Sequence, residues 1–189
     1  PVLVDNRPGA AGSLAMSALV RSAPDGHTLA LATMSQAVFN AYLFAKLSYD
    51  PLRDLEPVAP LVNGAMVLAA YPSFAANTLQ EFIALAKKKP GALNVSSAGL
   101  GTLNHLAAEL FKMRTGTHIV HIPYRGGVPA LQAVMNDEVQ LFMGSWVAIG
   151  PHVKSGRVKA LGVTSAKRYS VAPELPTLQE GGVRDFDVS

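Results

Sequence analysis

The chain has 189 residues, of which 49% are hydrophobic and 15% charged, and this globular composition excludes an intrinsically disordered protein. Its formal net charge is +3, and the basic residues are scattered along the sequence. They do not form the clusters of aromatic and basic residues typical of nucleic-acid binding, so we expect no nucleic-acid partner. Cysteine is absent, which excludes thiol catalysis, cysteine-ligated zinc and disulfides, and no apolar run reaches the roughly 18–20 residues of a membrane-spanning helix.

The first third of the chain has a weak secondary-structure pattern. Its predicted elements are strands at 2–4, 28–32 and 66–71 and a small-residue helix at 13–22. Pro24-Asp25-Gly26 forms a turn, and residues 33–60 are irregular. The chain opens on what looks like a strand already under way, and no signal peptide precedes it. We therefore expect a mature or truncated piece of a longer protein.

The remainder alternates regularly between helices and strands. Thr78 and Glu81 form a capping box for one helix, Thr102 caps a second that Gly116 ends, and Pro129 opens a third. The predicted elements are helices from 79, 103, 129 and 147 and strands at 93–96, 118–122, 139–143 and 158–164. The tail from Pro173 is expected to form a turn, a short helix and the start of another strand.

This alternation predicts an α/β architecture with a largely parallel sheet. If the strands are parallel, the loops Ser97–Gly101, Pro123–Gly127 and Gly144–Trp146 leave the sheet at one edge, and each leads into a helix. A helix N-terminus offers free N–H groups and a partial positive charge, so glycine- and hydroxyl-rich loops there suit a carboxylate. The alternative is that these glycines only form tight turns.

Three other kinds of site are weakly supported. The Gly99-x-Gly101 pattern lacks the third glycine and the acidic residue of a dinucleotide fingerprint. Ser145 lacks the following glycine of a nucleophile elbow, so a small α/β hydrolase or transferase remains only the alternative function. His118 and His121, three apart on a strand, point to opposite faces and cannot chelate one metal.

Three side chains lie near the predicted loops, and two of them allow two interpretations. His105 either orients the Gly-rich loop or is a plain surface or capping residue. Trp146 either stacks on a ligand or closes the lobe. The hydroxyl of Tyr124 falls near the predicted pocket, which makes it the better ligand candidate.

The ordered motifs resemble the Bug family of extracytoplasmic solute receptors of tripartite tricarboxylate transporters. The matching stretches cover almost the whole chain: Val4–Gly12, Ala23–Leu29, Ser97–Ala107, His121–Gly126, Val163–Arg168 and Pro173–Thr177. The resemblance implies a type II periplasmic binding-protein fold of two lobes, with mixed, mainly parallel sheets flanked by helices. Lobe one would comprise residues 1–71 and 164–189, and lobe two residues 72–163.

The resemblance also implies that lobe one is incomplete here. A family member begins roughly 40 residues earlier and continues well past Ser189, and both parts belong to lobe one. Many members have an acidic residue and an asparagine where Gly144-Ser145-Trp146 stand, so ligand preference does not carry over at that point.

The implied function is that of a periplasmic receptor and not of an enzyme. It would close its lobes around a small carboxylate, an organic acid or an amino acid, and deliver it to the permease subunits of a tripartite transporter. We expect no cofactor or metal, and a monomer for the full-length protein. The expected ligand-binding residues are Thr33, Ser35, Ser97, Ala98, Gly99, Gly101, Thr102, His105, Tyr124, Gly126 and Ser145.

Overall fold

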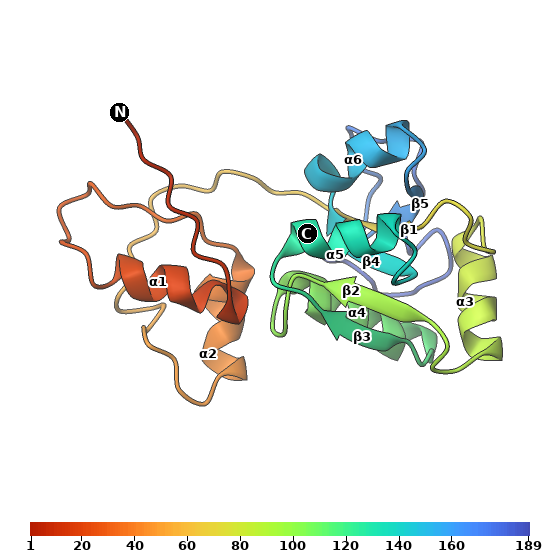
Figure 1. The fold of residues 1–189 in the computed structure, drawn as a ribbon, viewed down its shortest axis with the longest axis horizontal. Coiled ribbons are helices and arrows are strands. Elements are labelled where there is room, and N and C mark those ends of the chain that lie inside the picture. The colour runs from red at the N-terminus through yellow and green to blue at the C-terminus, as the bar shows by residue number, and fades with distance from the viewer.

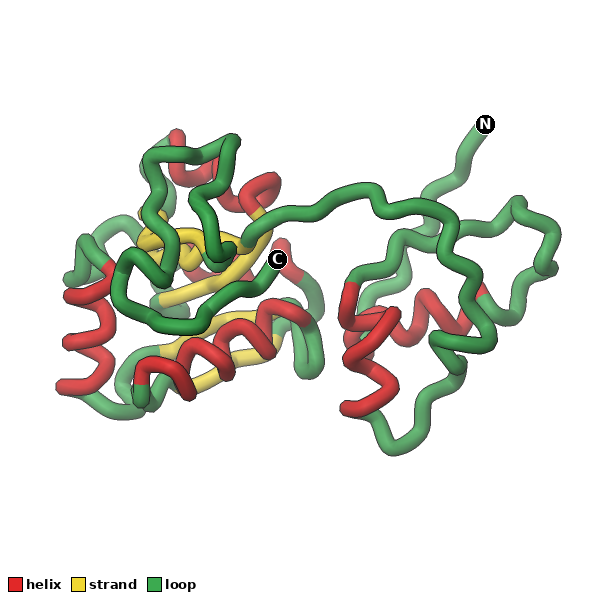
Figure 2. Tube along the Cα trace, turned by 180° about the vertical axis from the view of Figure 1, so that it is seen from behind, coloured by secondary structure: helices red, strands yellow, loops and turns green.

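The computed structural model describes residues 1–189 and shows two bodies joined by an extended segment (Figure 1). The N-terminal body contains helices and loops but no strand (Figure 2). Its elements are the 3-10 helix η1 (Ala10–Gly12), α1 (Ser13–Leu19), the π-helix η2 (Ser35–Phe39) and α2 (Asn40–Leu43). No helix in the chain combines the length and apolar character needed to cross a membrane.

The second body is built on one five-stranded sheet in the order β3-β2-β4-β1-β5. The strands are β1 (Met66–Ala70), β2 (Asn94–Ser97), β3 (Val120–Pro123), β4 (Leu141–Ser145) and β5 (Lys159–Val163). β2 pairs in parallel with β3 and β4, whereas β1 is antiparallel to β4 and β5. Four of the strands therefore run in one direction, which confirms the predicted mixed, mainly parallel α/β fold.

Two layers of helices cover the sheet. They are α3 (Leu79–Lys88), α4 (Leu103–Thr115), α5 (Gly127–Met135) and α6 (Trp146–Lys154). Because successive strand residues face opposite sides, Leu68 packs in the cluster with α3 and α4, while its neighbours Val67 and Ala69 pack in the cluster with α5 and α6. Both faces of β1, which lies between β4 and β5, are thus buried, as its unbroken apolar run requires.

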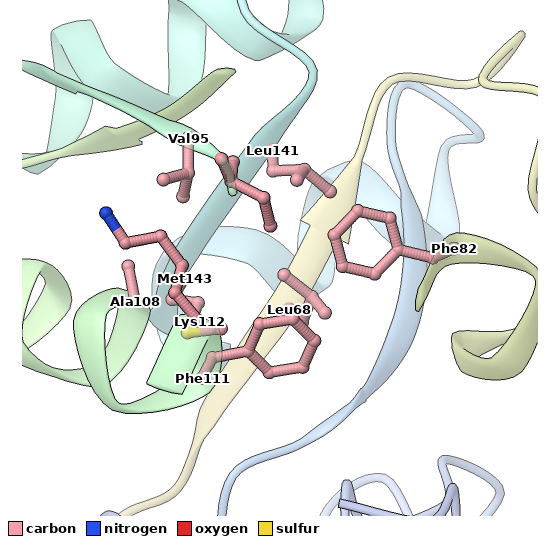
Figure 3. A pocket seen from close by; sticks show the side chains of 9 residues that line it. Leu68, Phe82, Val95, Ala108, Phe111, Lys112, Leu141 and Met143 are labelled. Atoms are coloured by element: carbon pink, nitrogen blue, oxygen red, sulfur yellow. The ribbon is translucent and has the colours of Figure 1, made fainter. Parts of the chain in front are cut away.

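The face with α3 and α4 contains a stack of aromatic rings. Phe82 and Phe111 lie 5.6 Å apart with nearly parallel planes, and both are fully buried. Beside them is a void of about 10 Å³ with an apolar lining that includes Leu68 and Val95 (Figure 3). A void of this size and character does not hold even one water molecule, so it is a packing defect and not a ligand site.

The C-terminal segment packs on the same sheet as residues 72–163. Thr177 forms a bridge with Val163, and Phe186 is fully buried in the cluster that contains β1. Thr164 Oγ1 accepts from Met66 N–H at 2.8 Å, which ties the residue after β5 to the first residue of β1. The division into lobes at 71/72 and 163/164 stays a prediction, and in this chain β1 and the C-terminal segment belong to the body of the sheet.

Several elements predicted for the N-terminal body and for the C-terminal tail were wrong. Residues 2–4 and 28–32 form no strand, and their side chains are exposed, Val2 by 95% and Leu31 by 82%. The physical reason is that neither segment has a neighbouring strand to receive its backbone hydrogen bonds. The tail forms turns in place of a short helix, and residues 35–43, predicted irregular, form the helices η2 and α2.

Candidate functional site

The carboxyl ends of three parallel strands meet at one edge of the sheet, as predicted. β2 leads through residues 98–102 into α4, β3 through 124–126 into α5, and β4 directly into α6. Three helix N-termini therefore converge where ligands bind in open α/β sheets.

The loop from Ser97 to Thr102 is held in shape by its own polar groups. Gly99 and Gly101 adopt φ values of +134° and +76°, which side chains other than hydrogen disfavour. Ser97 Oγ accepts from Gly99 N–H at 3.1 Å, and Thr102 Oγ1 donates to Gly99 O at 2.6 Å. The shape of the loop is therefore held by hydrogen bonds within the chain.

The second loop is tied to the first. Gly126 N–H donates to Ala98 O at 3.1 Å, and Tyr124 N–H donates to Ser97 O at 3.0 Å. The Tyr124 side chain is half-buried and packs against the hydrophobic cluster beneath α5. Four of the expected site residues are thus joined by backbone hydrogen bonds.

Most amides of the first loop already have partners within the chain. Gly99 N–H donates to Ser97, Gly101 N–H to His105 Nδ1 at 3.2 Å, and Thr102 N–H to Gly99 O at 3.3 Å. The amides of Leu100 and Asn104 donate to no other group of the chain. The Ala98 N–H likewise has no acceptor in the chain, and these three N–H groups can bind an anion without breaking the loop.

The N-terminal body meets this loop through η2 and α2. Ser35 is buried, and its Oγ accepts from Leu103 N–H at 3.2 Å, so a hydroxyl of the N-terminal body caps the first turn of α4. The Cα of Gly101 faces Leu43, whose Cδ1 lies 3.2 Å from the place of a Cβ. Thr33 is exposed just before η2, and its Oγ1 donates to Gln36 Oε1 in that helix at 2.7 Å.

The third exit, at β4, is the most open. Ser145 is the exposed N-cap of α6, and its side chain makes no capping hydrogen bond. The ring of Trp146 covers Gly150 one turn later, where a Cβ would lie 2.8 Å from the ring. This packing favours the reading in which the tryptophan closes the lobe. Gly144 is equally constrained, since the ring of Phe142 occupies the place of its Cβ.

A pair of histidines lies behind the first loop. The rings of His105 and His121 stack with centroids 4.1 Å apart and an interplanar angle of 29°. His121 Nε2 lies 2.6 Å from Ser97 Oγ. The sequence related His121 only to His118 on the same strand and did not predict its contact with His105, because helical and strand periodicity relate residues within one element and not across two.

The charged groups around this pair are already paired. Lys112 Nζ lies 2.5 Å from Glu109 Oε1, and His105 Nε2 lies 3.7 Å from the same oxygen. Imidazole and carboxylate atoms of His105, Glu109 and His121 come within 4.8 Å of one another, but each residue has a hydrogen-bond or ion-pair partner in the chain. The arrangement is a closed polar network and not an empty ligand set.

Burial lowers the pKa of both imidazoles. The pKa of His105 falls below its usual value because of desolvation, with Glu109 acting in the opposite direction and Lys112 adding to the fall. Desolvation and then the neighbouring His105 lower the pKa of His121 to about 4. Both rings are therefore neutral at pH 7.

A shallow groove of about 390 Å³ lies between η2, α4 and the C-terminal residues. It is lined by Met34, Phe39, Leu103, Leu106, Ala107, Leu110, Asp187, Val188 and Ser189. Its lining is mostly apolar, so it does not offer the donors that a carboxylate needs.

Comparison with known proteins identifies relatives along the whole chain. A model of the tripartite tricarboxylate transporter family receptor matches residues 1–189. Protein BugT of Bordetella pertussis is 35% identical over 190 residues, which cover 100% of this chain and 58% of that protein. The chain thus spans little more than half the length of the curated relatives that it matches.

Solved structures agree in fold. The adipate complex of Rpa4515 from R. palustris superposes with a TM-score of 0.95 at 31% identity, over 98% of this chain and 62% of that one. The malate complex of MatC from Rhodopseudomonas palustris gives 0.87 at 33% identity, over 95% and 61%. The periplasmic binding protein BugD gives 0.88 at 29% identity, over 99% and 62%. On this evidence the chain belongs to the tripartite tricarboxylate transporter receptor family, whose members are solute receptors and not enzymes.

Proposed function

We propose that this chain is part of a periplasmic receptor that holds a small dicarboxylate at the carboxyl edge of its sheet and delivers it to a membrane permease. The observation that carries the proposal is the convergence of three helix N-termini at that edge, opposite a buried hydroxyl of the N-terminal body. Adipate and malate in the related structures support this ligand class.

One carboxylate is expected at the start of α4. Leu100 and Asn104 offer unpaired N–H groups there, and the Thr102 hydroxyl lies between them in sequence. No charged side chain is needed, because a helix N-terminus is itself a site for anions. Ser145 and the first turn of α6, on the neighbouring strand exit, would receive the second carboxylate.

A matched pair of variants tests the site. Thr102→Val and Thr78→Val each remove a threonine hydroxyl that caps a helix, α4 and α3 respectively. Thr78 lies beyond β1, which runs antiparallel to β4, so it sits at the opposite edge of the sheet. Both variants should lose about 1 kcal/mol of stability. Only Thr102→Val should weaken binding of adipate or malate, by fivefold or more.

Binding can be followed through the intrinsic fluorescence of Trp146, the single tryptophan of the chain, and by calorimetry. Stabilisation that grows with dicarboxylate concentration, but not with a matched diamine, is the expected result. The proposal fails if the unaltered chain binds no carboxylate, or if the two threonine variants lose affinity equally.

A further inference from the structure

The stacked imidazole pair supports both glycines of the loop after β2. His121 Nε2 contacts Ser97 Oγ, which in turn accepts from Gly99 N–H. His105 Nδ1 accepts from Gly101 N–H. Each left-handed glycine is thus held, directly or through one hydroxyl, by one ring of the pair.

The contact with Gly101 depends on the protonation state of His105. An N–H group can donate only to a ring nitrogen that carries no proton, so the hydrogen of neutral His105 resides on Nε2. Nε2 faces Glu109 Oε1 at 3.7 Å, which is consistent with this tautomer. A doubly protonated ring would set the Nδ1–H donor against the Gly101 N–H donor and break the contact.

The surroundings of His105 act in both directions on its protonation, and burial, which favours the neutral ring, has the largest effect. Glu109 and Lys112 approach from α4, and the Lys112 ammonium pairs with the Glu109 carboxylate and so reduces its pull on the imidazole. His121 approaches from β3, and the loop after β2 contributes the Gly101 amide. Burial lowers the pKa of His105, in keeping with this surrounding.

We propose that His105 is a positioning residue of the carboxylate site, which holds the loop between Ser97 and Thr102 in its receptive shape only while Nδ1 is unprotonated. The inference rests on the proposed function, since it assigns a regulating role to a residue beside the same site. Protonation releases the Gly101 amide, the loop loses its shape, and carboxylate affinity falls as the solution becomes acidic.

Three variants separate positioning from mere packing. His105→Asn places an amide oxygen near the position of Nδ1, so it can accept from Gly101 but cannot take up a proton. His105→Leu removes the acceptor altogether. His118→Gln alters an exposed histidine outside the pair and serves as the control.

Adipate affinity is measured by calorimetry between pH 7.5 and 5. At pH 7.5 the unaltered chain and His118→Gln should bind alike. His105→Leu should bind about fivefold more weakly, the order expected for one hydrogen bond, and His105→Asn should recover part of that loss because it keeps an acceptor for Gly101 N–H. As the pH falls towards the pKa of His105, the unaltered chain and His118→Gln should weaken relative to His105→Asn, up to about fivefold once the ring is protonated. Because adipate itself takes up protons in this range, the ratio to His105→Asn at each pH removes the contribution of the ligand.

A second measurement needs no ligand. Nitrogen-15 spectra should show unprotonated Nδ1 in His105 at pH 7.5, and the Gly101 amide shift should follow the titration of that ring in the unaltered chain but not in His105→Asn. A proton on Nδ1 at pH 7.5, or parallel pH profiles of the unaltered chain and His105→Asn, overturns the proposal. Absence of adipate binding by every variant contradicts the proposed function instead, and the spectra still decide the role of His105.

Discussion

Alanine at Gly101 tests whether contact with the N-terminal body matters at the candidate site. Gly101 has a φ of +76°, and an added Cβ would lie 3.2 Å from Leu43 Cδ1 and 3.7 Å from Phe44 Cε2. Gly116, which ends α4, has a similar φ of +62°, but a Cβ there meets nothing within 4 Å. Gly101→Ala and Gly116→Ala therefore share the cost of a left-handed alanine, but only the methyl group at position 101 meets neighbouring side chains.

The expected magnitudes follow from this difference. A left-handed alanine costs about 1–2 kcal/mol, so Gly116→Ala should lose that amount and leave carboxylate binding unchanged. Gly101→Ala should lose about 1 kcal/mol more, at the low end for an extra methyl group in a packed contact. It should also weaken adipate binding, because the loop and α2 must move apart to admit the methyl group.

Urea unfolding monitored through Trp146 gives both stabilities, since the tryptophan and both glycines lie in the same body. In a chain of this length, 1 kcal/mol corresponds to roughly 2–4 °C in melting temperature, which thermal scans resolve. Equal losses of stability together with equal adipate affinities for the two variants would refute the reasoning. That result would mean that contact with the N-terminal body does not constrain the loop at Gly101.

Two further predictions concern stability. The pKa of His121 falls to about 4 in the folded protein from an ordinary 6.5, so the unfolded chain binds more protons and stability should fall as the pH drops from about 6.5 to 4. After discounting for screening of this half-exposed ring, the loss is about 1–2 kcal/mol, and His121→Gln should remove most of the difference between urea midpoints at pH 7 and 4.5. Phe82→Ala should cost about 3–5 kcal/mol because the ring is fully buried against Phe111, whereas Leu52→Ala, at a side chain 91% exposed, should stay within about 0.5 kcal/mol. A Phe82→Ala urea midpoint close to that of Leu52→Ala would contradict this account of the core.

The second body could be predicted because its local and long-range signals agree. Thr102 and Gly116 mark the two ends of α4 in the sequence, and the structure confirms both, with Gly116 in the left-handed conformation. The glycine loop was also found, since left-handed turns leave a trace in composition. The boundaries of β3 and β4 shifted by about two residues, because ladder pairing and not the apolar run sets where a strand ends: β3 pairs along its length with β2, and β4 with β1.

The partners of the site residues lay beyond sequence reasoning. The contact of Ser35 with the ligand stays a prediction, but the hydrogen bond from Leu103 N–H to its hydroxyl across the two bodies was not foreseen, since no periodicity relates positions 68 residues apart. The occupied amides of Gly99 and Gly101 were equally hidden. Whether a glycine N–H is free depends on the side chain that packs behind it, here Ser97 and His105.

The failed strands of the N-terminal body show why pattern alone does not decide secondary structure. Val2, Leu3 and Val4 are 95%, 92% and 76% exposed, although their composition favours a strand. A β-strand is stable only when neighbouring strands take its N–H and C=O groups and another layer buries one face. In the second body, by contrast, β1 has a similar apolar sequence, but it lies between β4 and β5 under two layers of helices. The same kind of sequence therefore becomes a buried strand or an exposed extended segment according to its neighbours. Supplying neighbouring strands, and not altering these residues, is what should convert the N-terminal segments into strands.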